Sequence, residues 1–109
     1  MKFNFEYKTR KFNLDVGVCN NVLSQARGLM FKKESLPLLF VFKSKKRRAI
    51  HSFFCIPFIA IWFDGEKITE IKNVRPWMFS IKPKYKFDKL LEIPSNDVTF
   101  KEFIDEEKI

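Results

Sequence analysis

The dipeptide Asp64-Gly65 constrains the fold of this 109-residue chain most strongly, because it lies between two segments with the composition of β-strands. The segment 56–63 is an almost unbroken run of aliphatic and aromatic residues, which is typical of a buried strand. An Asp-Gly pair readily adopts the positive φ angles of a two-residue type I′ turn. We therefore predict a β-hairpin that turns at Asp64-Gly65 and continues over 66–74, where irregular apolar spacing indicates a bulge.

The segments on either side of this hairpin extend the β-rich pattern. Apolar and polar residues alternate over 3–7 and 12–18, which predicts two N-terminal strands with one buried face each. Asn20 or Asn21 can cap a short helix near residues 21–28, and Gly28 can end it in the left-handed conformation. We expect further strands over 36–42, 49–55 and 85–93, and a strand or a helix over 97–107. The prediction is one mainly β (α+β) domain over 1–109, with a small barrel-like, mostly antiparallel sheet.

Charge and cysteine usage limit the compartment and the partners. The formal net charge of +8 favours acidic partners such as nucleic acid, although it also serves solubility. The first residues alternate polar with aromatic side chains and lack the apolar core of a secretory signal, so we expect a cytoplasmic protein with reduced Cys19 and Cys55. The longest nearly uncharged stretch, 49–63, is too short and too broken by Pro57 to span a bilayer.

His51 is the only histidine, so any scheme with a histidine base must use it. In the predicted strand 49–55, His51 and Cys55 share a face but lie two strand steps apart, too far for direct contact. The chain lacks the ligand spacings of zinc sites and the glycine patterns of phosphate-binding loops. We therefore predict no catalytic residue, no metal site and no cofactor, and we interpret His51 as a histidine bonded to backbone.

Residues 43–48 form the most basic segment, which we interpret as a loop between strands. Its five positive charges could neutralise several phosphates and release counterions. Trp77, in a proline-flanked segment, offers a stacking surface if it is exposed; the simpler interpretation packs it over one end of the sheet above a rim of solvated lysines. The candidate nucleic-acid contacts are Lys43, Lys45, Lys46, Arg47, Arg48, Trp77, Lys82 and Lys84.

Five segments occur in a specific order: A-R-G-L-M-F-K (26–32), L-L-F-V-F (38–42), I-H-S-F-F (50–54), P-F-I-A-I-W-F-D (57–64) and L-L-E-I-P (90–94). Together they resemble the prokaryotic family called domain of unknown function 192, over roughly 11–98. The resemblance implies a compact, barrel-like β domain with one short helix and no established activity. Members commonly carry an aspartate two residues after the proline that matches Pro57, where this chain has Ile59. The matched motif residues, which we interpret as mainly structural, are Gly28, Leu29, Met30, His51, Ser52, Pro57, Asp64 and Gly65.

Three classes of function remain open. The preferred class is a non-catalytic accessory or binding protein that presents a groove or a sheet edge to an unidentified ligand or protein. The second is a nucleic-acid-binding module that uses the 43–48 segment and the Trp77 region. The third is a hydrolase-like enzyme, which requires a pocket around His51 that also contains Asp64, Glu92 or Asp97.

Overall fold

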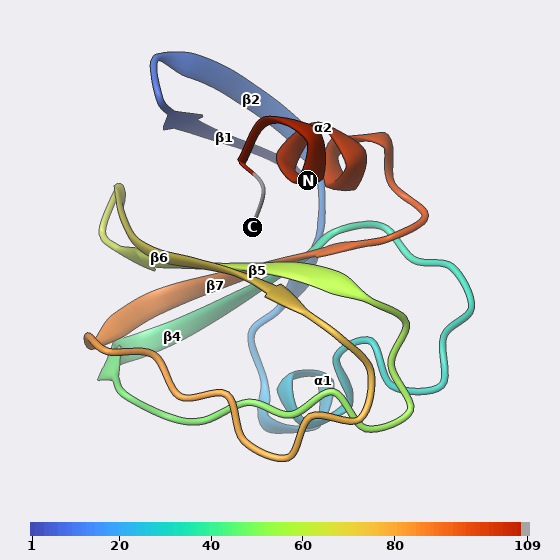
Figure 1. The fold of residues 1–109 in the computed structure, drawn as a ribbon. Coiled ribbons are helices and arrows are strands. Elements are labelled where there is room, and N and C mark those ends of the chain that lie inside the picture. Colours follow the sequence, from blue (N-terminus) through green and yellow to red (C-terminus); the bar gives the residue numbers. More distant parts are fainter. Residues whose placement is uncertain (108–109) are drawn as a thin grey trace.

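The computed structural model describes residues 1–107, apart from the side chains of residue 22 and of residues 105–107. Its central layer is a five-stranded sheet in the order β3-β4-β7-β5-β6 (Figure 1). These strands are β3 (Gly17–Cys19), β4 (Leu38–Lys46), β5 (Phe58–Asp64), β6 (Lys67–Val74) and β7 (Phe87–Pro94). Only β3 and β4 pair in parallel; the other neighbours in this sheet are antiparallel. The mainly β, mostly antiparallel fold is confirmed, but the described sheet stays open between β3 and β6 and does not close into a barrel.

The sheet is covered on both faces (Figure 1). The hairpin of β1 (Lys2–Tyr7) and β2 (Arg10–Asp15) covers one face together with the C-terminal helix α2 (Val98–Glu107). The short helix α1 (Val22–Arg27) and the connections 47–57 and 75–86 lie along the other face. Because β5 is sandwiched between both layers, all its residues from 58 to 63 are buried, which explains the unbroken apolar run.

The helix α1 has the predicted caps. The side chain of Asn21 accepts a hydrogen bond from the Ser24 backbone nitrogen at 2.9 Å, and the Ser24 hydroxyl accepts one from the Asn21 nitrogen. Gly28 ends the helix as predicted and donates its N–H to the Ser24 carbonyl, but its φ of 47° and ψ of −127° lie outside the left-handed helical conformation that we predicted. The amide of Gln25 donates to the carbonyl oxygens of Cys19 and Val41. This two-turn helix therefore depends on the strands beside it for its position.

The β5–β6 hairpin turns one residue later than predicted. Asp64 belongs to β5 and pairs with Lys67, so Gly65 and Glu66 form the turn. Gly65 has a φ angle of 64° and Glu66 has no positive φ, which matches a type II′ turn rather than type I′. The Gly65 N–H donates to the Asp88 carboxylate at 3.1 Å. The register shift between Trp62 and Phe63 confirms the predicted bulge.

Two predicted boundaries are wrong in ways that matter for function. β4 continues to Lys46, so most of the basic segment 43–48 lies on a strand rather than in a loop. The segment 49–55 is not a strand; it crosses the sheet face and makes one bridge, between Ile50 and Ile81. Ile50 and Cys55 are partly buried against side chains of the sheet, whereas Phe54 is exposed, and an apolar run alone does not distinguish this arrangement from strand pairing.

Candidate functional site

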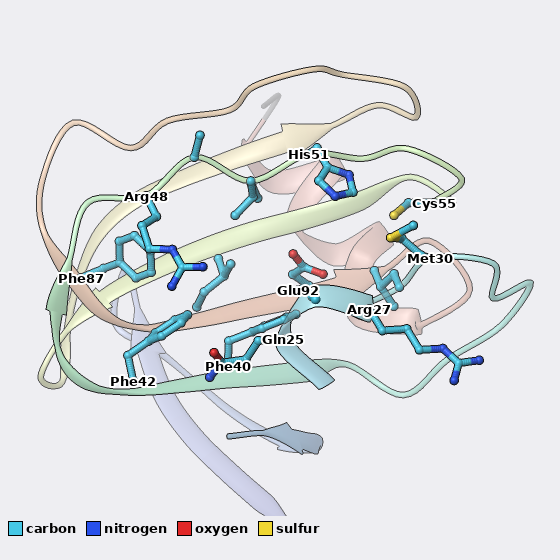
Figure 2. A pocket seen from close by; sticks show the side chains of 16 residues that line it. Gln25, Arg27, Met30, Phe40, Phe42, Arg48, His51, Cys55, Phe87 and Glu92 are labelled. Carbon is cyan, nitrogen blue, oxygen red and sulfur yellow. The ribbon is translucent and has the colours of Figure 1, made fainter. Parts of the chain in front are cut away.

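A cavity of about 170 Å³ lies between the sheet and the layer formed by α1 and the segment 48–55 (Figure 2). Cavities of about 150 Å³ hold a molecule the size of benzene, so this space fits a small ligand or a single chemical group. Its walls are largely apolar and include Phe40, Phe42, Ile50, Phe87 and Leu90. The polar or ionisable side chains that line it are Gln25, Arg27, Arg48, His51, Cys55 and Glu92.

Glu92 is the ionisable group at the base of this cavity. Alternation along β7 directs Leu90 and Glu92 toward the cavity, while Leu91 and Ile93 face the layer of α2. Glu92 is only 6% exposed, and no hydrogen bond or ion pair reaches its carboxyl group from any residue that the structure describes. Burial raises the pKa of this carboxyl from 4.5 to about 8. An unpaired buried carboxyl costs stability unless a partner from outside the chain compensates it.

Arg48 and His51 stand across the cavity from Glu92. Both residues are exposed, and Figure 2 shows the Arg48 guanidinium directed toward the cavity, whereas Arg27 points away from it. The Nδ1 atom of His51 accepts a hydrogen bond from the Phe53 N–H at 3.2 Å. The opening is therefore cationic, while the base carries a carboxyl group.

The cavity also contains a thiol that is poorly suited to nucleophilic attack. Cys55 Sγ donates to the Phe53 carbonyl at 3.4 Å. Burial, and then the negative charge of Glu92, raises the pKa of the Cys55 thiol to about 11. The same two causes raise the pKa of Cys19, which is buried and also a free thiol. Both cysteines are protonated at neutral pH, so this environment disfavours thiolate chemistry.

The pocket required by the hydrolase hypothesis is present in part. His51 and Glu92 line the same cavity, but Asp64 and Asp97 do not. Asp64 forms an exposed ion pair with Lys45 at 2.9 Å, and Asp97 accepts a hydrogen bond from the Thr99 N–H at the start of α2. Among the side chains that the structure describes, no three of His, Cys, Asp or Glu converge in a way that could hold a metal ion.

The candidate nucleic-acid contacts are distributed over different environments. Arg47 donates through Nε to the Pro83 carbonyl, and Lys84 donates its backbone N–H to Glu70. Trp77 is 56% exposed and contacts Phe53 and Phe54, so it is not buried over the end of the sheet. Lys43, Lys45 and Lys82 are exposed, Lys46 is half-buried, and Arg48 lines the cavity.

Four of the eight family-motif residues line the cavity. Gly28, Leu29, Met30 and His51 line it, whereas Asp64 and Gly65 belong to the distant β5–β6 turn. Pro57 precedes β5, and its carbonyl accepts a hydrogen bond from the Ser95 N–H.

Ser52 is fully buried and holds the layer above the sheet together. Its hydroxyl accepts a hydrogen bond from the Met78 N–H at 2.7 Å and donates to the Arg75 carbonyl at 2.6 Å. Its carbonyl accepts from the Trp77 and Cys55 N–H groups. This one residue therefore joins the 51–55 segment to the 75–78 segment.

Sequence reasoning treated Glu92 only as a possible companion of His51 and missed its central position. The signal was present in L-L-E-I-P, where a charged residue interrupts a run typical of a doubly covered strand. Ile59, at the position where family members commonly have an aspartate, is buried in the core on the α2 side of the sheet. It lies on the face opposite to Glu92, so a carboxyl group there would not line this cavity.

Comparison with known proteins places the chain among uncharacterised proteins. The family model described as DUF192, an uncharacterized ACR, matches residues 5–103. A UPF0127 protein of the archaeon Pyrococcus horikoshii is 28% identical over 93 residues, which cover 82% of this chain and 80% of that protein. A UPF0127 protein of Pyrococcus abyssi is 29% identical over 83 residues, which cover 72% and 71%.

Two solved bacterial structures share the fold. A protein of unknown function from Novosphingobium aromaticivorans superposes with a TM-score of 0.74 at 15% identity, covering 85% of this chain and 71% of that one. A putative transcription regulator from Sinorhizobium meliloti superposes with a TM-score of 0.76 at 17% identity, covering 88% and 80%. At these identities the likeness extends to the fold alone. None of the helices described here is long and apolar enough to cross a membrane.

Proposed function

We propose that this chain, which belongs to the DUF192 family of uncharacterised proteins, is a non-catalytic binding domain whose ligand enters the Glu92 cavity. The observation that carries the proposal is the buried, unpaired carboxyl of Glu92 facing an otherwise apolar cavity. Buried polar groups are nearly always hydrogen-bonded, and a group that has no partner within the chain is a candidate for a ligand contact. The proposal includes a single domain in the cytoplasm, where Cys19 and Cys55 stay reduced.

The cavity specifies the chemistry of the ligand. A volume of about 170 Å³ accepts a group similar in size to benzene. An N–H donor such as an amine or an amidine pairs with the Glu92 carboxylate, while Phe40, Leu90 and Phe87 surround the apolar part. Arg48, at the opening, suits an acceptor or an anionic group at the other end of the ligand. The expected ligand is therefore a small molecule or side chain with an N–H donor at its buried end.

Binding without catalysis is favoured by the state of the cavity groups. The Cys55 thiol has a raised pKa and is a weak nucleophile. His51 uses Nδ1 to accept a backbone hydrogen bond. Apart from His51 and Glu92, Cys55 is the one nucleophilic side chain among the described residues that line the cavity, and its thiol is protonated.

A titration with benzamidine, a benzene ring that carries an amidine, tests the proposal. We expect amide resonances of residues 25–30 and 48–55 to shift in two-dimensional NMR spectra of the wild-type protein. Glu92→Gln keeps the shape of the side chain but loses the charge, so its affinity for benzamidine should fall about tenfold or more, the range of a charge-assisted hydrogen bond. Glu66→Gln, at an exposed acid in the β5–β6 turn, is the matched control and should bind like the wild type.

Benzyl alcohol serves as a neutral ligand of similar size. It should bind more weakly than benzamidine to the wild type and similarly to the wild type and Glu92→Gln. Equal benzamidine affinity for Glu92→Gln and the wild type, or shifts confined to residues outside the cavity, would contradict the proposed site.

A further inference from the structure

A continuous row of aromatic rings lies next to the cavity, on its outer side. We call the rings of Phe31, His51, Phe53, Phe54, Trp77 and Phe79 the aromatic row. Neighbouring ring centroids are 4.6 to 6.0 Å apart, from the Phe31–Phe54 stack to the Phe53–Trp77 contact. The rings come from three separate segments, which follow α1, precede β5 and follow β6. The fold therefore assembles the row; no single segment produces it.

Much of the row faces solvent. Phe79 is 83% exposed, Phe31 68%, Trp77 56% and Phe54 49%. The core of this face is built from other side chains, among them Phe40, Phe58, Trp62 and Phe87. A set of contiguous exposed rings is unusual on a monomeric domain and marks an interaction surface.

The backbone holds three of these rings outward in an unfavourable conformation. Phe31, Phe54 and Trp77 have φ angles of 62°, 58° and 65°, a region that bulky side chains rarely adopt. Hydrogen bonds hold this geometry, since Phe31 N–H donates to the Phe54 carbonyl and Trp77 N–H to the buried Ser52. Strain of this kind is typical of ligand-binding surfaces. The rings are thus fixed in place before any partner arrives.

The charge around the row has one sign. The segments 25–33, 47–57 and 75–86 together contain nine Lys and Arg and no Asp or Glu. Lys32 and Lys33 directly follow Phe31, and Arg75 precedes Trp77 by two residues. Acids close to these segments include Glu92 within the cavity, Glu34, which directly follows the first segment, and Glu70, which accepts the Lys84 N–H. The cations therefore lie on the same connecting segments as the rings, which favours an anionic partner.

We propose that the aromatic row and its flanking cations bind single-stranded nucleic acid. Bases stack on exposed rings such as Phe79 and Trp77, and Arg75, Lys32 and Lys33 contact phosphates, the combination that single-strand-binding surfaces use. Duplex readout requires a helix or ribbon that enters a groove, and this surface is built from connecting segments. Neither α1 nor α2 contributes to the row, so this surface lacks the amphipathic helix by which many proteins lie on a membrane. This assignment does not depend on which ligand occupies the Glu92 cavity.

Fluorescence anisotropy with a labelled oligothymidylate of about 15 nucleotides, near the upper end of common site sizes, tests the assignment. We expect wild-type binding to weaken steeply between about 50 and about 200 mM salt, because phosphate contacts release counterions. The same protein should bind a duplex of equal length more weakly. Trp77 fluorescence should be quenched on binding, and the buried Trp62 left in a Trp77→Phe variant should show no quenching.

Two pairs of variants separate stacking from charge. Phe79→Ala should weaken oligothymidylate binding about five- to a hundredfold, the range measured for loss of one stacking ring. Val98→Ala, at an exposed apolar residue of α2 on the opposite face, should bind like the wild type. Arg75→Gln should reduce the slope of log affinity against log salt by about 1, while Lys101→Gln on α2 should leave it unchanged.

Contrary results overturn the assignment directly. Salt-independent binding, tighter binding to duplex, or a Phe79→Ala variant that binds like the wild type would each reject it. Sedimentation with phosphatidylserine vesicles tests the competing assignment. If the wild type sediments with the vesicles but does not bind oligothymidylate, and Phe79→Ala does not sediment with them, the row binds an anionic membrane surface instead. Loss of oligothymidylate binding with retained benzamidine binding would leave the Glu92 cavity intact as a separate site.

Discussion

The Oε1 atom of Glu92 lies 3.7 Å from the point that a β-carbon on Gly28 would occupy. The end of α1 and the strand β7 therefore approach each other across the cavity. Because Gly28 has no side chain, the cavity stays open beside the Glu92 carboxyl. The lack of a β-carbon also permits the backbone conformation of Gly28, because residues with a β-carbon avoid the combination of φ 47° and ψ −127°. Gly28 is thus required both for the end of the helix and for the shape of the site.

Gly28→Ala should destabilise the fold by about 1–3 kcal/mol, the cost of holding a non-glycine residue in this conformation. The added β-carbon would also lie 3.2 Å from Phe40 Cζ, and Gly28→Val should cost more because its branches extend further into the cavity wall. Urea denaturation measures the change. The control is Gly65→Ala, because Gly65 has a φ angle of 64° but no atom within 4 Å of the added β-carbon. This variant should lose only the stability that the positive φ angle costs an alanine. Equal stability of Gly28→Val and the wild type would contradict the role of Gly28.

Glu92 should make the stability of the protein depend on pH. The pKa of Glu92 is about 8 in the folded protein, compared with a reference value of 4.5 for the unfolded chain. Between these two pH values the folded protein therefore binds more protons than the unfolded chain does. Stability is therefore greatest below about pH 4.5 with respect to this group, falls as the pH rises toward 8 and levels off above it. The total loss is on the order of a few kcal/mol, because each pKa unit corresponds to about 1.4 kcal/mol.

The Glu92→Gln variant tests this dependence, since it cannot ionise. It should be more stable than the wild type at pH 8.5 and similar to it at pH 5, by urea denaturation at both values. Glu66→Gln, at an exposed acid, should follow the wild type at both pH values. If Glu92→Gln and the wild type lost stability equally between pH 5 and pH 8.5, the carboxyl would not be the group responsible.

The sequence allowed good predictions where local chemistry determines the structure. The caps of α1 at Asn21 and Gly28, the β5–β6 pairing and its bulge depend on residues close together in the chain, and they are confirmed. The 49–55 segment was predicted wrongly because it crosses the sheet face, partly burying Ile50 and Cys55 and leaving Phe54 exposed, and an apolar run does not encode this tertiary arrangement. The aromatic row was missed for a related reason: Phe31, Phe54 and Trp77 meet only after three distant segments are brought together.

Ser52→Ala should destabilise the layer above the sheet more than an ordinary serine replacement. The variant leaves the half-buried Met78 N–H without the 2.7 Å hydrogen bond to the hydroxyl and removes the bond to the Arg75 carbonyl. Loss of such buried partners costs about 1–3 kcal/mol each. Amide hydrogen exchange should show faster exchange for residues 75–78 and 51–55 while β5 and β7 stay protected.

Ser80→Ala, at an exposed serine in the same connection, is the control for Ser52→Ala and should change neither stability nor exchange. The Ser52 variant should also weaken oligothymidylate binding, because loss of the hydroxyl's bonds to Arg75 and Met78 loosens the segment that positions Trp77 between them. Unchanged exchange at residues 75–78 would show that other contacts hold this layer in place.

The reactivity of Cys55 should report the charge of Glu92. Burial contributes most to the raised pKa of this thiol, and the Glu92 carboxylate contributes next. Reaction with a disulfide reagent such as dithionitrobenzoate should therefore be slow in the folded wild type, since only the thiolate attacks. Glu92→Gln should accelerate the reaction at pH 9, where the wild-type carboxyl is ionised, but not at pH 6.5, where it is mostly protonated.

A Cys55→Ser variant separates the reaction of Cys55 from that of the buried Cys19. Once unfolded in urea, the wild type and Glu92→Gln should react equally fast. An acceleration of the same size at pH 6.5 and pH 9 would mean that Glu92→Gln acts by loosening the structure rather than by removing a negative charge.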